Sequence, residues 1–281
     1  MNASVIRAID LLEVLAKEKK PTPLKDLAAA AKLDKATAYR LLSSLLKRGL
    51  VHKPGDGGLY SLGPAFLLFA EAFRKSLAIR EKVLPHLRGL VEDTEETAIY
   101  CERFQRDSCV TVERWDSPHQ TRTFSETGLP RPLSVGSSGQ AILAMLPESE
   151  IVAIISGKPP LRYTPFTPTS RGRLLKKIEE TRRRGYSVSI QERNLYTAGI
   201  AAPVFNDRSV LGSLSVIGPA ERIKQNGIET IGRSVLKTAR KLSMELGFRE
   251  ENAQLFAGNF RSDLRLNRVA RKVSSDFRTR G

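Results

Sequence analysis

The apolar positions in residues 24–31 recur at steps of three and four residues, the spacing that places them on one face of a helix. Thr22 stands just before this pattern and is followed by Pro23, and these residue types are favoured at the cap and at the first position of a helix. The pattern therefore predicts a short helix with Thr22 as its N-cap. Residues 32–34 then break the periodicity.

A second amphipathic pattern begins at Lys35. Asp34 can accept hydrogen bonds from the first turn of this helix, and Gly49 is the kind of residue that ends one. Two helices joined by a tight turn form a helix-turn-helix, in which the second helix enters the DNA major groove. The predicted buried face of the second helix consists of Ala38, Leu41, Leu42 and Leu45.

The predicted outer face of the second helix is basic and rich in hydroxyl groups. Arg40 is a bidentate donor for guanine, and short hydroxyl side chains reach bases or phosphates. Lys47 and Arg48 lie near the negative end of the helix dipole, where they can meet phosphates. The alternative is a solvated face on an ordinary helical hairpin. The candidate DNA-contacting residues of this helix are Lys35, Thr37, Tyr39, Arg40, Ser44 and Lys47.

Residues 50–53 and 59–62 have the composition of two short strands around a Gly-rich turn at residues 54–58. A basic helix-turn-helix followed at once by such a hairpin predicts a winged helix. Lys53 on the wing is expected to contact the DNA backbone. Residues 4–17 predict a third helix behind the other two, with an inward face of Val5, Ile6, Ile9, Leu11, Leu12 and Leu15.

Residues 65–76 predict a further helix with a broad apolar stripe. A stripe this apolar suits a partner helix from a second subunit, and winged helices usually read two half-sites. The alternative is that the helix docks on the chain's own second domain. The stripe consists of Phe66, Phe69, Phe73 and Leu77.

The pattern after this helix predicts a second domain. The predicted strands are residues 97–104, 109–115, 120–126, 186–191, 199–206 and 210–217. The predicted helices are residues 77–93, 140–146, 148–156, 171–184 and 225–246. Two groups of strands with helices before, between and after them indicate an α+β fold, an antiparallel sheet with helices packed on it.

The composition of the chain also predicts a polyanionic binding partner. The 281-residue chain has a formal net charge of +16, and residues 1–62 hold eleven Lys or Arg against six Asp or Glu. No apolar run approaches the ~18 residues of a spanning helix. Asp10 and Glu13 interrupt the first apolar stretch, which argues against a signal peptide. The two cysteines lack disulfide spacing and favour a reducing cytoplasm.

The last segment, residues 249–281, repeats apolar residues among eight Lys or Arg and four Asp or Glu. Its Gly, Asn and Ser content weakens the helical pattern, so we expect a basic tail that is disordered or loosely docked. An arm that touches DNA or bridges subunits is the alternative.

Several motifs in this order resemble the IclR family of bacterial transcription regulators. They are LDKATAYRLLSSLLKRGLV, YSLG, REKVLPHLRGLVEDTEET, GLPRPLSVGSSGQAILA, GYSVSIQERNLYTAGIAAPVF and LGSLSVIGP. The resemblance implies a winged helix at residues 1–63, a linker helix at 64–77 and an effector-binding domain with a GAF-like fold at 78–248, followed by the tail. It also implies operator DNA, a small-molecule effector and a homodimer or dimer of dimers, in the bacterial cytoplasm at the nucleoid.

The resemblance further implies an effector pocket, in which a loop rich in Ser and Gly closes over a small anionic or polar ligand. The positions of this sequence that correspond to ligand-binding residues are Ser137, Ser138, Ser189, Glu192, Gly199 and Ser215.

The pocket motifs of this chain depart from the family pattern at several positions. Ser189 and Ile190 replace two acids, whereas Glu192 keeps its charge. Gly199 stands where a Cys is common, and Ile217 replaces the second Ser of a pair. These departures predict a less acidic, slightly roomier and more apolar pocket for a small organic acid, with aromatic acids included.

Other chemistries have little support in the sequence. The GSSG motif at residues 136–139 lacks the G-x-S-x-G spacing, and all three His precede it, so no enzyme is predicted. His and Cys show no ligand spacing, so neither a metal nor a cofactor is predicted. Tyr100 and Trp115 are expected in the core of the sheet. Cys109 is expected to be buried, with a redox sensor as the alternative.

Together these patterns predict a ligand-responsive, DNA-binding transcriptional regulator that acts at least as a dimer. Two alternatives remain. One is an oligomeric DNA-binding protein with no small-molecule effector, and the other is an enzyme with a vestigial winged helix.

Overall fold

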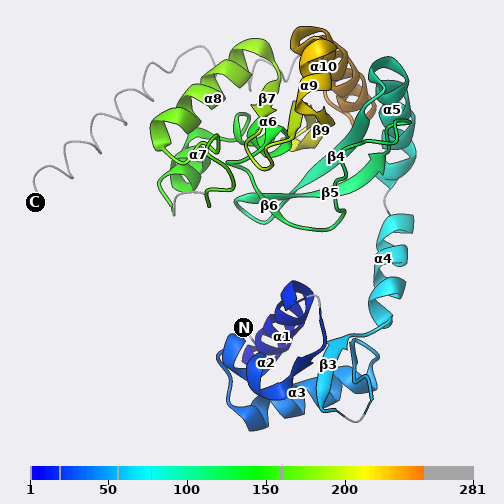
Figure 1. Ribbon diagram of the computed structural model, residues 1–281, viewed down its shortest axis with the longest axis vertical. Helices are drawn as coiled ribbons and strands as arrows, with labels where there is room; N and C mark the ends of the chain where they lie inside the picture. The colour runs from blue at the N-terminus through cyan, green and yellow to red at the C-terminus, as the bar shows by residue number, and fades with distance from the viewer. Residues whose placement is uncertain (1, 19, 56, 77, 158–160, 250–281) are drawn as a thin grey trace, which may run out of the picture. The chain divides into compact units, whose positions relative to one another are not determined.

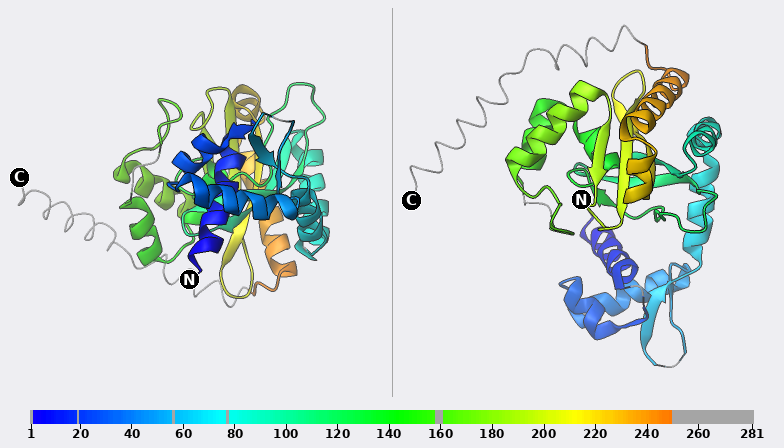
Figure 2. Two further views of the ribbon diagram at one scale, coloured as in Figure 1. Left: turned by 90° about the horizontal axis from the view of Figure 1, so that it is seen from below. Right: turned by 45° about the horizontal axis from the view of Figure 1, so that its top comes forward.

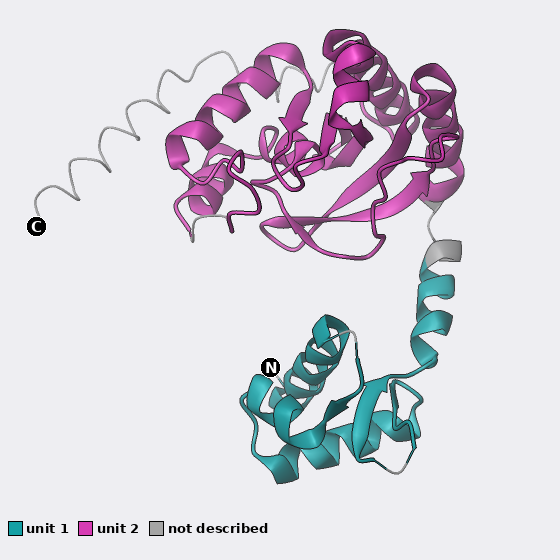
Figure 3. Ribbon diagram, viewed as in Figure 1, with its two compact units in different colours: residues 1–78 teal, residues 79–281 magenta. Residues whose placement is uncertain are grey.

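The computed structural model describes residues 2–18, 20–55, 57–76, 78–157 and 161–249. It divides into two compact units, residues 1–78 and 79–281 (Figure 3). The tail from residue 250 onward lies outside the described residues. Among the described residues, no helix combines the length and apolarity needed to span a bilayer.

Unit 1 is a winged helix-turn-helix, as the sequence predicts (Figure 1). Its strands pair antiparallel in the order β1-β3-β2, and β2 and β3 form the wing. The helices are α1 (Ala3–Glu18), α2 (Leu24–Ala30) and α3 (Lys35–Lys47), and the strands are β1 (Thr22–Pro23), β2 (Val51–His52) and β3 (Leu59–Leu62).

One apolar core joins α1, α2 and α3 to the wing. It contains the predicted buried positions Ala38 and Leu42 of α3. Leu41 and Leu45 pack against it while partly buried. The core consists of Leu11, Leu15, Leu27, Ala28, Ala38, Leu42, Val51 and Tyr60.

The first half of α1 departs from the prediction. Val5, Ile6 and Ile9 are 54%, 42% and 49% exposed, so their assignment to the inward face is wrong. Only the second half of α1 contributes fully buried side chains, Leu11 and Leu15, to the core of this unit.

The two helix caps have different outcomes. Asp34 caps α3 as predicted, because its carboxylate accepts a hydrogen bond of 2.8 Å from the Thr37 N–H. Thr22 does not cap α2: it lies in β1, opposite Tyr60, and its hydroxyl donates to the Lys20 carbonyl at 3.0 Å. Pro23 is the residue that precedes α2, without a side-chain hydrogen bond to the helix. These extended residues form the third strand of the wing sheet.

The next helix, α4 (Ala65–Ser76), carries exposed apolar side chains. Leu67, Leu68 and Phe69 are 73%, 74% and 60% exposed in the single chain. The subunit interface predicted for this helix stays a prediction.

Unit 2 is built on a six-stranded antiparallel sheet with the order β6-β5-β4-β9-β8-β7, which confirms the predicted α+β class. Its strands are β4 (Thr97–Phe104), β5 (Ser108–Trp115), β6 (Arg131–Pro132), β7 (Ser187–Ile190), β8 (Thr197–Phe205) and β9 (Val210–Pro219). Its helices are α5 (Ala78–Thr94), α6 (Ser137–Leu143), α7 (Glu148–Ile155), α8 (Arg171–Arg184), α9 (Ala220–Gln225) and α10 (Ile228–Glu245).

The sheet of unit 2 lies between two layers of helices, because neighbouring strand residues point to opposite faces. Ala98 and Tyr100 of β4 pack with α5 and α10 in one core. Ile99 and Cys101 face the other side and pack with α6, α7 and α8. Figure 1 and the right-hand view of Figure 2 show α5 and α10 on one side of the sheet and α8 on the other.

The strand predicted at residues 120–126 is wrong, since this segment is irregular. The outer edge of β5 pairs instead with the short strand β6, which the sequence did not predict. Ser125 is fully buried, and its carbonyl accepts a hydrogen bond of 2.7 Å from Arg114 Nη1. Side-chain contacts therefore hold a segment that has no strand partner.

Three further predictions for unit 2 need correction. The helix predicted at residues 225–246 is α10, which begins at Ile228 after Gly227 with a φ of 84°, and a separate short helix, α9, precedes it. The helix predicted to begin at Gln140 begins at Ser137, so its serines belong to the first turn rather than to a loop. Tyr100 is fully buried as expected, whereas Trp115 at the end of β5 is 40% exposed.

Candidate functional site

The outer face of α3 presents the predicted basic and hydroxyl groups together. Lys35, Tyr39, Arg40, Ser44 and Lys47 are exposed, and Thr37 is half-buried. Arg40 Nη2 lies 3.4 Å from the Thr37 hydroxyl, and no ion pair holds it among the described residues. The Ser44 hydroxyl donates to the Arg40 carbonyl at 3.0 Å. Arg40 is therefore a long cationic side chain of this face that is available to a ligand.

The first turn of α3 is fixed electrostatically. Hydrogen bonds from Thr37 hold the pKa of Asp34 below its ordinary value. The carboxylate is therefore charged at neutral pH and keeps its place at the positive end of the helix dipole. This cap orients the residues that begin the basic face.

Lys53 follows β2 and is exposed. Its Nζ lies 6.0 Å from the centre of the Tyr60 ring, and Tyr60 belongs to the core of unit 1. The wing thus presents an exposed cation of unit 1 that lies outside α3.

Unit 2 contains a pocket of about 290 Å³ between the sheet, the start of α6 and the loop after β7. Its apolar wall includes Ile99, Val135 and Ile217. Five of the six positions that the resemblance assigned to the ligand line this pocket: Ser137, Ser138, Ser189, Glu192 and Gly199.

The sixth position, Ser215, lies behind the wall. Its hydroxyl is 2.7 Å from that of Ser138, so it fixes a lining residue. Gly199 leaves room for the neighbouring serine, because a Cβ there would lie 2.6 Å from Ser137 Oγ. The sequence therefore brings the six positions together, although their contact with a ligand remains a prediction.

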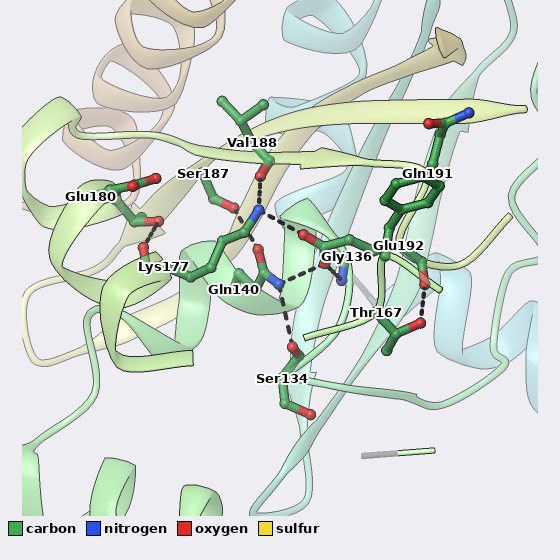
Figure 4. Close-up of polar contacts among 12 residues, drawn as sticks. Ser134, Gly136, Gln140, Thr167, Lys177, Glu180, Ser187, Val188, Gln191 and Glu192 are labelled. Carbon is green, nitrogen blue, oxygen red and sulfur yellow. Dashed lines mark hydrogen bonds and ion pairs between the residues drawn. The ribbon is translucent and has the colours of Figure 1, made fainter. Parts of the chain in front are cut away.

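Glu192 is engaged within the protein (Figure 4). One carboxylate oxygen lies 2.7 Å from Lys177 Nζ of α8. The other accepts hydrogen bonds from Gln140 Nε2 at 2.7 Å and from the Gly136 N–H at 3.1 Å. The Glu192 carbonyl accepts from Thr167 Oγ1 at 2.6 Å. With 2% of its surface exposed, Glu192 ties the pocket wall to α6 and α8.

Two arginines that sequence reasoning missed also line the pocket. Arg131 comes from β6 and Arg193 from the loop after β7. Burial and the neighbouring Arg131 lower the pKa of Arg193. The signal in the sequence was Arg193 directly after Glu192, but nothing local indicated that Arg131, far away in the chain, would meet it.

Cys109 lies on the same pocket wall and is buried, as predicted. A hydrogen bond with Cys101 and burial raise the pKa of the Cys109 thiol above its ordinary value. The protonated thiol of Cys109 is a weak nucleophile, whereas the same hydrogen bond lowers the pKa of the buried Cys101 to about 6, so the redox-sensor alternative stays a prediction. Across the described part of the chain, no cluster of three or more His, Cys, Asp or Glu could hold a metal ion.

A winged helix with an exposed basic recognition helix, joined in one chain to an α+β unit with a pocket, is the architecture of a DNA-binding transcriptional regulator. The chain belongs to the IclR family. Residues 4–55 match the IclR helix-turn-helix domain, and residues 72–244 match the C-terminal domain of bacterial IclR transcriptional regulators.

Curated relatives and solved structures agree with this assignment. The transcriptional repressor IclR of Escherichia coli K12 is 28% identical over 246 residues, which cover 87% of this chain and 90% of the relative. The regulator KipR of Bacillus subtilis is 28% identical over 248 residues, which cover 88% and 98%.

Among solved structures, a putative IclR regulator from Silicibacter sp. TM1040 has a TM-score of 0.77 at 28% identity and covers 88% of this chain and 97% of its own. An IclR homolog from Microbacterium hydrocarbonoxydans, complexed with 4-hydroxybenzoate, has a TM-score of 0.71 at 22% identity and covers 87% and 99%. The latter likeness concerns the fold.

Proposed function

We propose that this protein is a sequence-specific transcriptional regulator whose affinity for its operator is controlled by a small organic acid bound in the pocket of unit 2. The observation that carries the DNA-binding half is the exposed outer face of α3, where Arg40 forms no ion pair among the described residues. Lys35, Thr37, Arg40 and Ser44 meet base edges in the major groove, and Lys53 meets the DNA backbone.

The chemistry of the pocket supports an organic acid as the effector. Arg131 and Arg193 supply positive charge, the serines supply hydroxyl groups, and Ile99, Val135 and Ile217 supply an apolar surface. The neighbour from Microbacterium hydrocarbonoxydans is complexed with 4-hydroxybenzoate, whose carboxylate, hydroxyl group and ring are complementary to these three surfaces. An aromatic or aliphatic carboxylic acid matches the same surfaces here.

Dimerisation gives the effector a way to act on DNA. The exposed side chains Leu67, Leu68 and Phe69 of α4 are available to a second subunit. Two winged helices would then read half-sites one helical turn apart, or a multiple of it. An effector that favours one spacing of the two winged helices changes operator affinity about 5–150-fold, which corresponds to a coupling free energy of about 1–3 kcal/mol.

The experiment is a binding titration with the full chain. DNA selected from a random-sequence library and an unselected duplex are compared by fluorescence anisotropy, with and without a panel of carboxylic acids. We expect at least about a 10³-fold preference for the selected DNA, and a shift in that affinity with one class of acid.

Two outcomes contradict the proposal. Equal affinity for both duplexes with a steep salt dependence would indicate binding to the phosphate backbone alone. A strong preference that no acid changes would favour the DNA-binding protein without an effector.

A further inference from the structure

The pocket of unit 2 holds two guanidinium groups that pair with no carboxylate among the described residues. Arg131 Nη1 donates to the Ser125 hydroxyl at 2.9 Å. The Arg193 guanidinium lies 5.8 Å from the centre of the Tyr163 ring. The Nε atom of each arginine is buried without a hydrogen-bond partner among the described residues. Neither partner, a hydroxyl or an aromatic ring, carries a negative charge.

The acid nearest to these arginines in the pocket wall is already committed. Glu192 lines the pocket, but its carboxylate pairs with Lys177 and accepts from Gln140 and Gly136. Across the described residues, neither Arg131 nor Arg193 forms an ion pair with a carboxylate. The lining of the pocket therefore contains two positive charges that no carboxylate of the described residues neutralises.

Such unpaired charge is unfavourable in a partly enclosed site. Buried charges are normally paired, and two like charges that share a cavity repel each other. The planar fork of a guanidinium matches a carboxylate in a bidentate contact better than it matches water or a halide. An occupant with two carboxylates would supply both counter-charges.

We infer that the effector is a small dicarboxylate, with Arg131 and Arg193 as the residues that determine its charge. This inference rests on the proposed function, because it specifies the ligand class of the same pocket. A volume of about 290 Å³ suits a metabolite smaller than a drug-sized ligand. The body of the dicarboxylate lies against Ile99 and Ile217, and the serine hydroxyls are left for its other polar groups.

The test compares acids that differ in one carboxylate. The full chain is titrated with terephthalate and benzoate as one pair, with succinate and butyrate as the other, and with inorganic phosphate. Binding is followed by calorimetry and by the melting temperature, which a ligand of the folded state must raise. Trp115, the single Trp of the chain, lies in unit 2 and reports its melting.

We expect one of the dicarboxylates to bind at least tenfold more tightly than its monocarboxylate and than phosphate. Arg131→Gln and Arg193→Gln should each weaken that binding at least tenfold. The matched control is Arg173→Gln, which removes the same charge from an exposed position of α8 outside the pocket and should leave binding unchanged. The Trp115 emission spectrum verifies that each variant is folded.

Equal affinities within both pairs overturn the inference, as does unchanged dicarboxylate binding in the two pocket variants. No stabilisation by either dicarboxylate also overturns it, and phosphate binding as tightly as the dicarboxylates would indicate an unselective anion site. The preference of the wild-type protein for selected DNA is measured in the same preparation. Its absence would contradict the proposed function while leaving the pocket result intact.

Discussion

The basic face of α3 and the pocket of unit 2 both present arginines that have no carboxylate partner in the described part of the chain, but they do so in different surroundings. Arg40 stands on an exposed helix face, whereas Arg193 is half-buried, with its Nε sealed from solvent. Water solvates the first charge at little cost, and DNA can replace that water along an extended surface. The second charge is costly to desolvate and needs a compact anion that enters the cavity.

The difference shows how one chain can address two kinds of anion. Exposed cations around short hydroxyls suit a long polyanion, and their number sets the salt dependence of binding. Enclosed cations against an apolar wall suit one small anion, and their geometry sets its selectivity.

The largest effect on stability is expected when the carboxylate of Glu192 is removed from the pocket wall. Glu192→Ala leaves Lys177 as a third unneutralised cation and removes the acceptor of Gln140 and Gly136. We expect the free energy of unfolding of unit 2 to fall by up to about 3 kcal/mol, because removing one member of a buried ion pair leaves the charge of the other member uncompensated. Urea titration followed by Trp115 fluorescence measures the change.

Glu180→Ala on α8 is the matched control. Its carboxylate is 36% exposed and lies 3.9 Å from Arg184, so its loss should cost less than about 0.5 kcal/mol. Equal destabilisation by the two substitutions would mean that Glu192 contributes no more than a surface charge.

A smaller effect of opposite sign is expected for Arg131→Gln without ligand. This substitution removes the repulsion between Arg131 and Arg193, so unit 2 should become more stable by up to about 1 kcal/mol. The same urea titration applies. A loss of stability larger than that of Arg173→Gln would show that the Arg131 guanidinium is needed for folding.

On the DNA side, Lys53→Ala should weaken binding to selected and unselected DNA alike. A phosphate contact carries no sequence information, so the slope of log K against log salt should become shallower by about 1. Anisotropy titrations between low and moderate salt give the slope. A change in the preference between the two duplexes would instead place Lys53 at a base.

The smallest effect concerns Cys109. Because its pKa is raised, the thiol should remain unlabelled by iodoacetamide at neutral pH in the folded protein and react once urea unfolds unit 2. Mass spectrometry of the peptides locates the label. Rapid labelling of folded protein at Cys109 would support the redox-sensor alternative.

Sequence reasoning succeeded where structure depends on neighbouring residues. The buried stripe of α3, its cap at Asp34 and its basic outer face all follow from a helical period within a short segment. The hairpin of β8 and β9 follows equally from two apolar runs on either side of a tight turn. Local patterns specify local structure, and the recognition helix is local.

It failed where the outcome depends on distant partners. Residues 120–126 alternate like a strand, but β6 occupies the edge that they would need. Thr22 has the residue type and position of a helix N-cap, but it pairs with Tyr60 in the wing sheet. Arg131 and Arg193 line the same pocket only because β6 and the loop after β7 meet there. The resemblance to a known family located this pocket, whereas its charge became visible in the structure.

The most direct test of the account is the DNA preference of Arg40→Ala in the full chain. Its affinity for selected and unselected DNA is compared with that of the wild type by anisotropy at one salt concentration. Loss of a bidentate base contact should cost about 1–3 kcal/mol on selected DNA, with little change on unselected DNA. An unchanged ratio between the two affinities would contradict the assignment of α3 as the element that reads the operator.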